Sequence, residues 1–133
     1  MSGAPVQRLQ ASGLHDGGFA HVSVVAPGST VFTAGISPLD KNGELVLPGD
    51  ALAQTRRCLE ALAEVLAEAG AGPETVARLT VYVVTDSNDV LGQVWRIVDD
   101  WFAVTPAAIV LGVQVLPYPG QVVEVEAVAA ARL

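Results

Sequence analysis

The chain has 133 residues, 7 basic and 14 acidic, so its net charge is −7 with neutral histidines. This length fits one domain, because two separate cores would each be marginal. The acidic balance argues against nucleic acid as a partner, since phosphate binding requires a basic surface that releases counterions. Hydrophobic residues make up 51% of the chain, which excludes disorder, and charged residues only 16%. So few charges favour a surface partly covered by another subunit.

The uncharged stretch from Trp101 to Val123 is long enough on paper to span a bilayer. Prolines, glycines and glutamines interrupt it, so it predicts a buried strand followed by a proline-rich turn, and we expect no membrane partner. The single cysteine, Cys58, cannot form an internal disulfide, and no secretory signal is visible. We therefore expect a reducing, cytoplasmic setting. Neither HExxH nor a cysteine cluster is present, so we expect no metal and no cofactor.

Residues 1–17 contain glycines and predict a loose N-terminal arm, ahead of a single domain over residues 18–133. Two β-rich runs follow, at residues 21–25 and 31–36. The turn signal between them, Ala26-Pro27-Gly28-Ser29, predicts that they form a hairpin.

Two amphipathic helices are predicted next. Asp50 is typical of a helix N-cap, and Gly70 and Gly72 supply the stop. The first helix carries apolar residues at helical spacing, namely Leu52, Leu59, Leu62, Val65, Leu66 and Ala69. The segment Thr85-Asp86-Ser87 caps the second helix, whose apolar face comprises Val90, Leu91, Val94, Ile97, Val98, Trp101 and Phe102.

Strands are predicted over residues 75–84, 107–115 and 121–129. This order of elements indicates an α+β fold in which both helices pack on one face of a sheet. Side chains alternate between the faces of a strand, so Glu124 and Glu126 share the face that points away from the helices, about 7 Å apart. A neighbouring subunit would pack on that face, which makes these carboxylates chemically interesting.

Several segments resemble one protein family in order and spacing. They are Thr33-Ala34-Gly35-Ile36-Ser37-Pro38, Asn42-Gly43-Glu44, Ala53-Gln54-Thr55-Arg56, Val81-Tyr82-Val83, Pro106-Ala107 and Val123-Glu124-Val125-Glu126-Ala127-Val128-Ala129. Together they are similar to the Rid family, also called YjgF or L-PSP endoribonuclease-like. The resemblance covers roughly residues 19–130.

The resemblance implies a chorismate-mutase-like mixed β-sheet with two helices on one face, assembled as a homotrimeric barrel. Three clefts would lie between subunits, and typical members hydrolyse imines and enamines there without metal or organic cofactor. Glu124 matches the family glutamate and Gly35 the hairpin glycine; together they would position the attacking water. A family arginine that binds the substrate carboxylate stands at Ala108 in this chain.

Other positions depart from the family as well. Phe19 replaces a tyrosine, Val110 a cysteine, and Val94 or Trp95 an asparagine. Loss of a bidentate carboxylate clamp is not a conservative change. The departures predict an apolar cleft, lined by Phe19, Ile36, Trp95, Ala108, Val110 and Tyr118, that suits a neutral or aromatic small molecule.

Each candidate also has a structural interpretation. Glu124 is the best acid/base candidate, and otherwise a solvated carboxylate or a partner of Arg132. His21 is favoured as a hydrogen-bonded sheet residue over a proton carrier, and Cys58 as a packed thiol over a nucleophile. Tyr118 is a candidate substrate contact or proton donor.

Two functions follow from these residues. The first is a diverged Rid-type enzyme that hydrolyses, dehydrates or tautomerises an imine, enamine or related carbonyl compound. The retained Glu124 and Gly35 favour it. The second is a non-catalytic trimer that binds a small hydrophobic ligand or a partner protein. The combined loss of the family arginine, tyrosine, asparagine and cysteine, at Ala108, Phe19, Val94 or Trp95, and Val110, favours it.

Overall fold

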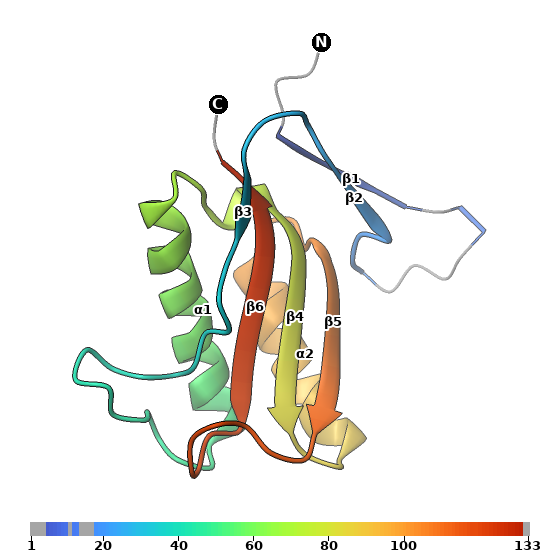
Figure 1. Ribbon diagram of the computed structural model, residues 1–133. Helices are drawn as coiled ribbons and strands as arrows, with labels where there is room; N and C mark the ends of the chain where they lie inside the picture. Colours follow the sequence, from blue (N-terminus) through green and yellow to red (C-terminus); the bar gives the residue numbers. More distant parts are fainter. Residues whose placement is uncertain (1–4, 11, 14–17, 132–133) are drawn as a thin grey trace.

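The computed structural model describes residues 5–10, 12–13 and 18–131. Both helices pack against one face of a four-stranded sheet with the strand order β3-β6-β4-β5 (Figure 1). The elements are β1 (Val6–Leu9), β2 (Val22–Val25), β3 (Thr30–Phe32), α1 (Ala51–Glu68), the short 3₁₀ helix η1 (Pro73–Thr75), β4 (Val76–Val84), α2 (Asn88–Trp101), β5 (Ala107–Val113) and β6 (Val123–Ala130). The sheet is mixed, because β4 pairs parallel with β5 and antiparallel with β6. The predicted α+β class is confirmed.

The predicted hairpin between residues 21–25 and 31–36 is wrong. Strand β2 pairs with β1, and β3 pairs with the far end of β6, so residues 26–29 carry the chain from one sheet to the other. Four residues of the predicted loose arm thus form β1. Apolar burial accounts for this difference, because Val6 packs into a small cluster with Ala77 and Ala130.

Helix α1 begins as predicted, with the Asp50 carboxylate accepting a hydrogen bond from the Ala53 amide at 3.0 Å. Leu59, Leu62 and Leu66 are fully buried. Val65, however, is 42% exposed, so its assignment to the apolar stripe is wrong. Val65 lies near the C-terminal end of α1, where Ala67, Glu68 and Ala69 are exposed as well, so the assignment of Ala69 to the stripe is also wrong.

Helix α2 also begins as predicted, because the Ser87 hydroxyl accepts from the Val90 amide at 3.3 Å. Val94 and Val98 are fully buried against the sheet. Trp101 and Phe102 stack edge to face at its end, with ring centroids 4.9 Å apart. No helix among the described residues has the combination of length and apolar character that crossing a membrane requires.

Strand β6 shows the predicted alternation. Val123, Val125, Ala127 and Ala129 are at most 4% exposed and belong to the core under the helices. Their neighbours Val122, Glu124, Glu126 and Val128 are half-buried on the opposite face. We call this opposite face of the β3-β6-β4-β5 sheet the open face.

Candidate functional site

Glu124 lies near the start of β6, on the open face, opposite Tyr82 of β4. Its Oε1 atom accepts a hydrogen bond from the Ser37 hydroxyl at 3.0 Å and a longer one from Gln121 Nε2 at 3.4 Å. The Gln121 side chain is almost completely buried, and Ser37 is half-buried. The carboxylate is therefore held from one side by two neutral donors.

Gly35 lies directly against this carboxylate. A Cβ atom built on Gly35 would stand 3.0 Å from Glu124 Oε2 and 3.1 Å from Glu124 Cδ. The backbone there does not require positive φ, so the short approach, and not the turn geometry, favours glycine. The structure thus brings together Glu124 and Gly35, the two residues that the family resemblance singled out.

The backbone around Gly35 is fixed on both sides. The Thr33 amide donates to the Ala127 carbonyl at 3.0 Å, and Ile36 exchanges two backbone hydrogen bonds with Val125. Between these anchors Gly35 leaves the ladder and passes over Glu124. The Ile36 bridge buries the Ile36 side chain in the core among the helices. The Ile36 side chain thus contributes to the core, and its place in a cleft lining stays a prediction.

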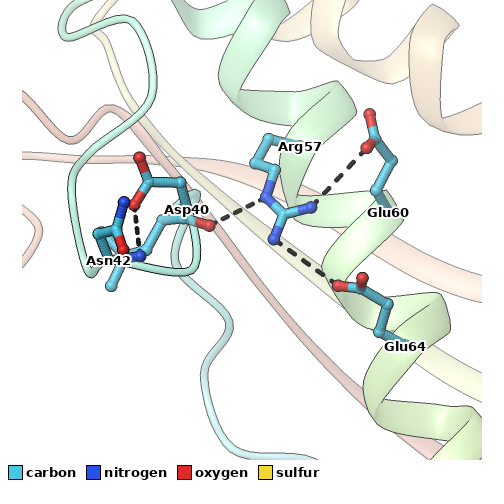
Figure 2. A network of polar contacts seen from close by, with 6 residues as sticks. Asp40, Asn42, Arg57, Glu60 and Glu64 are labelled. Atoms are coloured by element: carbon cyan, nitrogen blue, oxygen red, sulfur yellow. Dashed lines mark hydrogen bonds and ion pairs between the residues drawn. The ribbon is translucent and has the colours of Figure 1, made fainter.

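The loop that follows is anchored to α1 by Arg57. Figure 2 shows the guanidinium reaching from the helix to this loop, where its Nε atom donates to the Leu39 carbonyl at 2.9 Å. Glu60 and Glu64 flank it at 3.7 and 3.6 Å. The Asp40 carboxylate closes the turn by accepting from the Asn42 amide at 2.8 Å. Exposed ion pairs add little stability. The hydrogen bond from Arg57 to the Leu39 carbonyl is therefore the contact that holds the loop in place.

A buried glutamine, Gln54 of α1, ties two loops together. Its amide nitrogen donates to the carbonyls of Leu47 and Gly120, and its oxygen accepts from the amides of Val122 and Val123. This uses both donors and both lone pairs of the amide. Sequence reasoning did not assign this role. A glutamine four residues before Cys58 on the buried stripe of an amphipathic helix is the signal that could have revealed it.

Cys58 lies in the core behind this site, completely buried. Burial raises the pKa of its thiol to about 12, the negative charge of Glu124 adds to this, and Arg57 opposes it. The Cys58 sulfur is 3.5 Å from the Ile36 carbonyl oxygen. Only a thiolate is a strong nucleophile, so this thiol is a packing group at neutral pH.

The second carboxylate of β6 has a different partner. The Tyr82 hydroxyl donates to Glu126 Oε1 at 2.6 Å, and this hydrogen bond is the main reason why the pKa of Tyr82 is raised. Glu126 borders a small hollow of about 190 Å³ on the open face, shared with Phe32, Arg78 and Thr80. Two neighbouring carboxylates on one face are thus held by separate groups.

Four of the predicted substrate-binding residues meet in one hollow of about 290 Å³. We call it the Phe19 hollow, and it is lined by Phe19, Trp95, Ala108, Ile109 and Val110. The rings of Phe19 and Trp95 meet edge to face with centroids 5.9 Å apart. His21 packs against the other side of Phe19 at 6.0 Å. The lining carries no charged side chain.

The Phe19 hollow and Glu124 do not meet within one chain. Glu124 pairs with Tyr82, and Tyr82 with Leu111, so these three share the open face. Ala108 pairs with Leu79, a core residue of the face that the helices cover. The two groups of candidate residues therefore lie on opposite faces of the same sheet.

Tyr118 lies apart from both groups. Its ring is exposed and borders another hollow of about 350 Å³, together with Val84, Val115 and Val122. Its backbone amide, however, donates to Gln121 Oε1 at 3.2 Å. Arg132, the alternative partner of Glu124, lies outside the described residues. Within those residues, no group of three or more histidine, cysteine or acidic side chains is arranged to hold a metal ion.

Comparisons with known proteins relate this chain to one family. Residues 16–131 match the family model described as Endoribonuclease L-PSP. A RutC family protein of Pyrococcus abyssi is 33% identical over 103 residues, which are 77% of this chain and 79% of the relative. The 3-aminoacrylate deaminase RutC of Acinetobacter baylyi is 42% identical over 50 residues, 38% of this chain and 40% of that protein. A Rid family protein of Yersinia pestis has the same fold, with 34% identity, a TM-score of 0.87 and coverage of 95% and 98%.

Proposed function

The chain belongs to the Rid family of YjgF- and RutC-like proteins, and on that premise we propose that it is an enzyme acting on a small imine, enamine or related carbonyl intermediate. The observation that carries the proposal is the contact between Gly35 and the Glu124 carboxylate, with Ser37 holding the other carboxylate oxygen. A carboxylate fixed in this way, with one oxygen to which none of the described residues donates, is suited to move a proton.

The chemistry for an imine is hydrolysis to a carbonyl compound and ammonia. Water bonds to the imine carbon, Glu124 takes one proton from that water, and the C=N electron pair moves to nitrogen, which receives the proton from Glu124. Glu124 then takes the hydroxyl proton of the carbinolamine and returns it to nitrogen as the C–N bond breaks. Each cycle consumes one water and leaves the carboxylate in its starting state.

We propose that the substrate binds between copies of the chain in a homotrimer. One subunit would supply Glu124 and Gly35 from its open face, and its neighbour the Phe19 hollow. Two observations support this: the two groups lie on opposite faces of one sheet, and Phe32 and Ile109 are exposed apolar side chains of that sheet. Apolar side chains in such positions are typical of a covered surface.

The proposed substrate carries an apolar or aromatic side chain. The Phe19 hollow contains two aromatic rings and aliphatic side chains, and Ala108 stands where a family arginine would bind a carboxylate. A carboxylate placed there would lose its hydration without gaining a charged partner. The volume of about 290 Å³ is at the lower limit for small-molecule pockets.

The uncharged lining also favours a second candidate, a trimer that binds an apolar ligand without turnover. The two candidates separate in an assay of ammonia release from enzymatically generated imines. Aliphatic acidic and bulky aromatic substrates are compared, for the wild type and for Glu124→Gln. We expect acceleration over buffer that is largest for aromatic imines and lost in Glu124→Gln. A flat response across the panel would exclude imine hydrolysis and favour the binding role.

A further inference from the structure

We infer that Ser37 and Gln121 are positioning residues that fix which oxygen of Glu124 exchanges the proton. Oε1 is held as a hydrogen-bond acceptor by these two side chains, and Oε2, the oxygen beside Gly35, is the reactive one. This inference rests on the proposed function, and it adds two residues that act through Glu124 without touching the substrate.

The orientation of the Gln121 side-chain amide determines which groups donate in the hydrogen bonds to Glu124. The Gln121 amide contacts the Tyr118 N–H, which can only donate, and the Val123 carbonyl, which can only accept. The oxygen of the amide must therefore face Tyr118 and its nitrogen must face Val123. Nε2 is then also the atom that lies 3.0 Å from the Ser37 hydroxyl oxygen. Two backbone groups thus determine the orientation of this buried amide.

The Ser37 hydroxyl lies between the Gln121 amide and the Glu124 carboxylate and forms a hydrogen bond with each. The two N–H groups of Gln121 Nε2 serve three acceptors: one points to the Val123 carbonyl, and the other is shared between the Ser37 hydroxyl at 3.0 Å and Glu124 Oε1 at 3.4 Å. Because the Ser37 hydroxyl accepts this hydrogen bond, its own proton is available for donation to Glu124 Oε1 at 3.0 Å. A proton placed on Oε1 would face a hydroxyl that is already donating and an amide nitrogen that cannot accept. Protonation of Oε1 would therefore require the Ser37 hydroxyl to turn its own proton away and to accept in place of donating.

Among the described residues, none donates a hydrogen bond to Oε2. It is the carboxylate oxygen nearest to Gly35, 3.0 Å from the position of a built Cβ, whereas Oε1 is 3.6 Å from it. A side chain at position 35 would crowd this oxygen. The arrangement leaves Oε2 free to take a proton from water and to return it to nitrogen, while Oε1 keeps the carboxylate plane fixed.

The same chain of contacts gives the proline-rich turn a role. Tyr118 lies in Pro117-Tyr118-Pro119-Gly120, and its backbone amide, not its ring, orients Gln121. The Gly120 carbonyl of this turn is held in turn by Gln54. The geometry of Glu124 therefore depends on a rigid turn through a backbone group that any residue other than proline could supply at position 118.

The test begins with a readout that requires no substrate. The infrared difference spectrum between the wild type and Glu124→Gln isolates the carboxylate bands of Glu124. We expect Ser37→Ala to shift these bands, Ser37→Thr to restore them, and Gln121→Leu to shift them in the same direction. Ser37→Ala and Ser37→Thr decide the test if Gln121→Leu does not fold. Identical bands in the wild type and Ser37→Ala would overturn the inference.

Kinetics supply the second arm. Loss of a hydrogen bond to a charged group predicts a decrease in kcat of about tenfold or more for Ser37→Ala, with KM unchanged. Ser87→Ala, which removes the N-cap of α2, is the matched control and should keep the kcat of the wild type. Turnover by the wild type with an unchanged kcat in Ser37→Ala would overturn the inference and leave the proposed function intact. Absence of turnover in the wild type would overturn the proposed function. The infrared bands would still show whether Ser37 holds the Glu124 carboxylate.

Discussion

The two groups of candidate residues are built in opposite ways. Around Glu124, Ser37 and Gln121 donate hydrogen bonds to one carboxylate oxygen, and the other oxygen lies against Gly35. In the Phe19 hollow, the lining is aromatic and aliphatic. The first group is held by directional bonds and the second by packing alone.

This difference separates two requirements of a catalyst. Moving a proton requires groups within a few tenths of an ångström of their working position, which hydrogen bonds to rigid backbone provide. Selecting a substrate by its apolar part requires only shape and the exclusion of water. We therefore expect the chemistry to be sensitive to small changes near Glu124, and the substrate range to be sensitive to changes in the hollow.

The largest expected effect comes from exchanging the carboxylate itself. Glu124→Gln keeps the shape of the side chain and removes the base, so kcat should fall by about 10²- to 10⁴-fold. Glu126→Gln is the matched control on the same strand and face, where the partner is the Tyr82 hydroxyl. Ammonia release measured for both variants checks this, and equal losses would contradict a specific role for Glu124.

A charge introduced into the hollow should change selectivity. Ala108→Arg places a cation where the chain has none, so KM for imines that carry a carboxylate should fall by about tenfold or more, while aromatic imines gain nothing. Ala108→Leu fills similar space without charge and serves as the control. If both variants alter the two substrate classes alike, the hollow does not contact the substrate.

Two glycine-to-alanine substitutions should have smaller effects, one beside Glu124 and one in α2. In Gly35→Ala the new Cβ would displace the Glu124 carboxylate by a few tenths of an ångström, and kcat should fall by about tenfold. Gly92→Ala in α2 meets no atom within 4 Å and should instead stabilise the fold by about 0.5–1 kcal/mol. Steady-state kinetics and thermal unfolding of both variants test this pair. Full activity in Gly35→Ala would mean that the approach to Oε2 is not needed.

Local signals predicted the framework of the fold. Asp50 and Ser87 cap the helices as expected, because capping depends on residues three positions apart. The alternation of buried and half-buried side chains in β6 was predicted correctly for the same reason. The hairpin at residues 21–36 was wrong because its turn signal is local, whereas the partners of β2 and β3 lie far along the chain.

The site was predictable only in part, for a related reason. The resemblance indicated Glu124 and Gly35, and the structure places them in contact. It gave no indication of Ser37 and Gln121, since the direction of their hydrogen bonds is determined by backbone groups of Tyr118 and Val123. A bridge to Val125 places the Ile36 side chain in the core, which the sequence pattern of its loop did not indicate.

The smallest effect at neutral pH concerns Cys58, which lies behind the Glu124 group. Burial, and then the charge of Glu124, raise the pKa of its thiol to about 12, against about 8.5 in an unfolded chain. Because the unfolded state releases this proton first, the stability contributed by the neutral thiol is complete below about pH 8.5 and is lost as the pH rises toward 12. Cys58→Ala removes this titration.

The free energy of unfolding, measured by denaturant at a series of alkaline pH values, should therefore decline less steeply in Cys58→Ala than in the wild type. Tyr82, whose pKa is also raised, titrates in both proteins, so the difference between the two slopes isolates the thiol. The Cys58→Ala/Glu124→Gln double variant is compared with Glu124→Gln alone. Without the Glu124 charge the pKa of the thiol is raised less, so its titration removes less unfolding free energy at alkaline pH. The difference in slope between Glu124→Gln and the double variant should therefore be smaller than the difference between the wild type and Cys58→Ala. Equal differences would mean that the carboxylate and the thiol do not interact through the sheet.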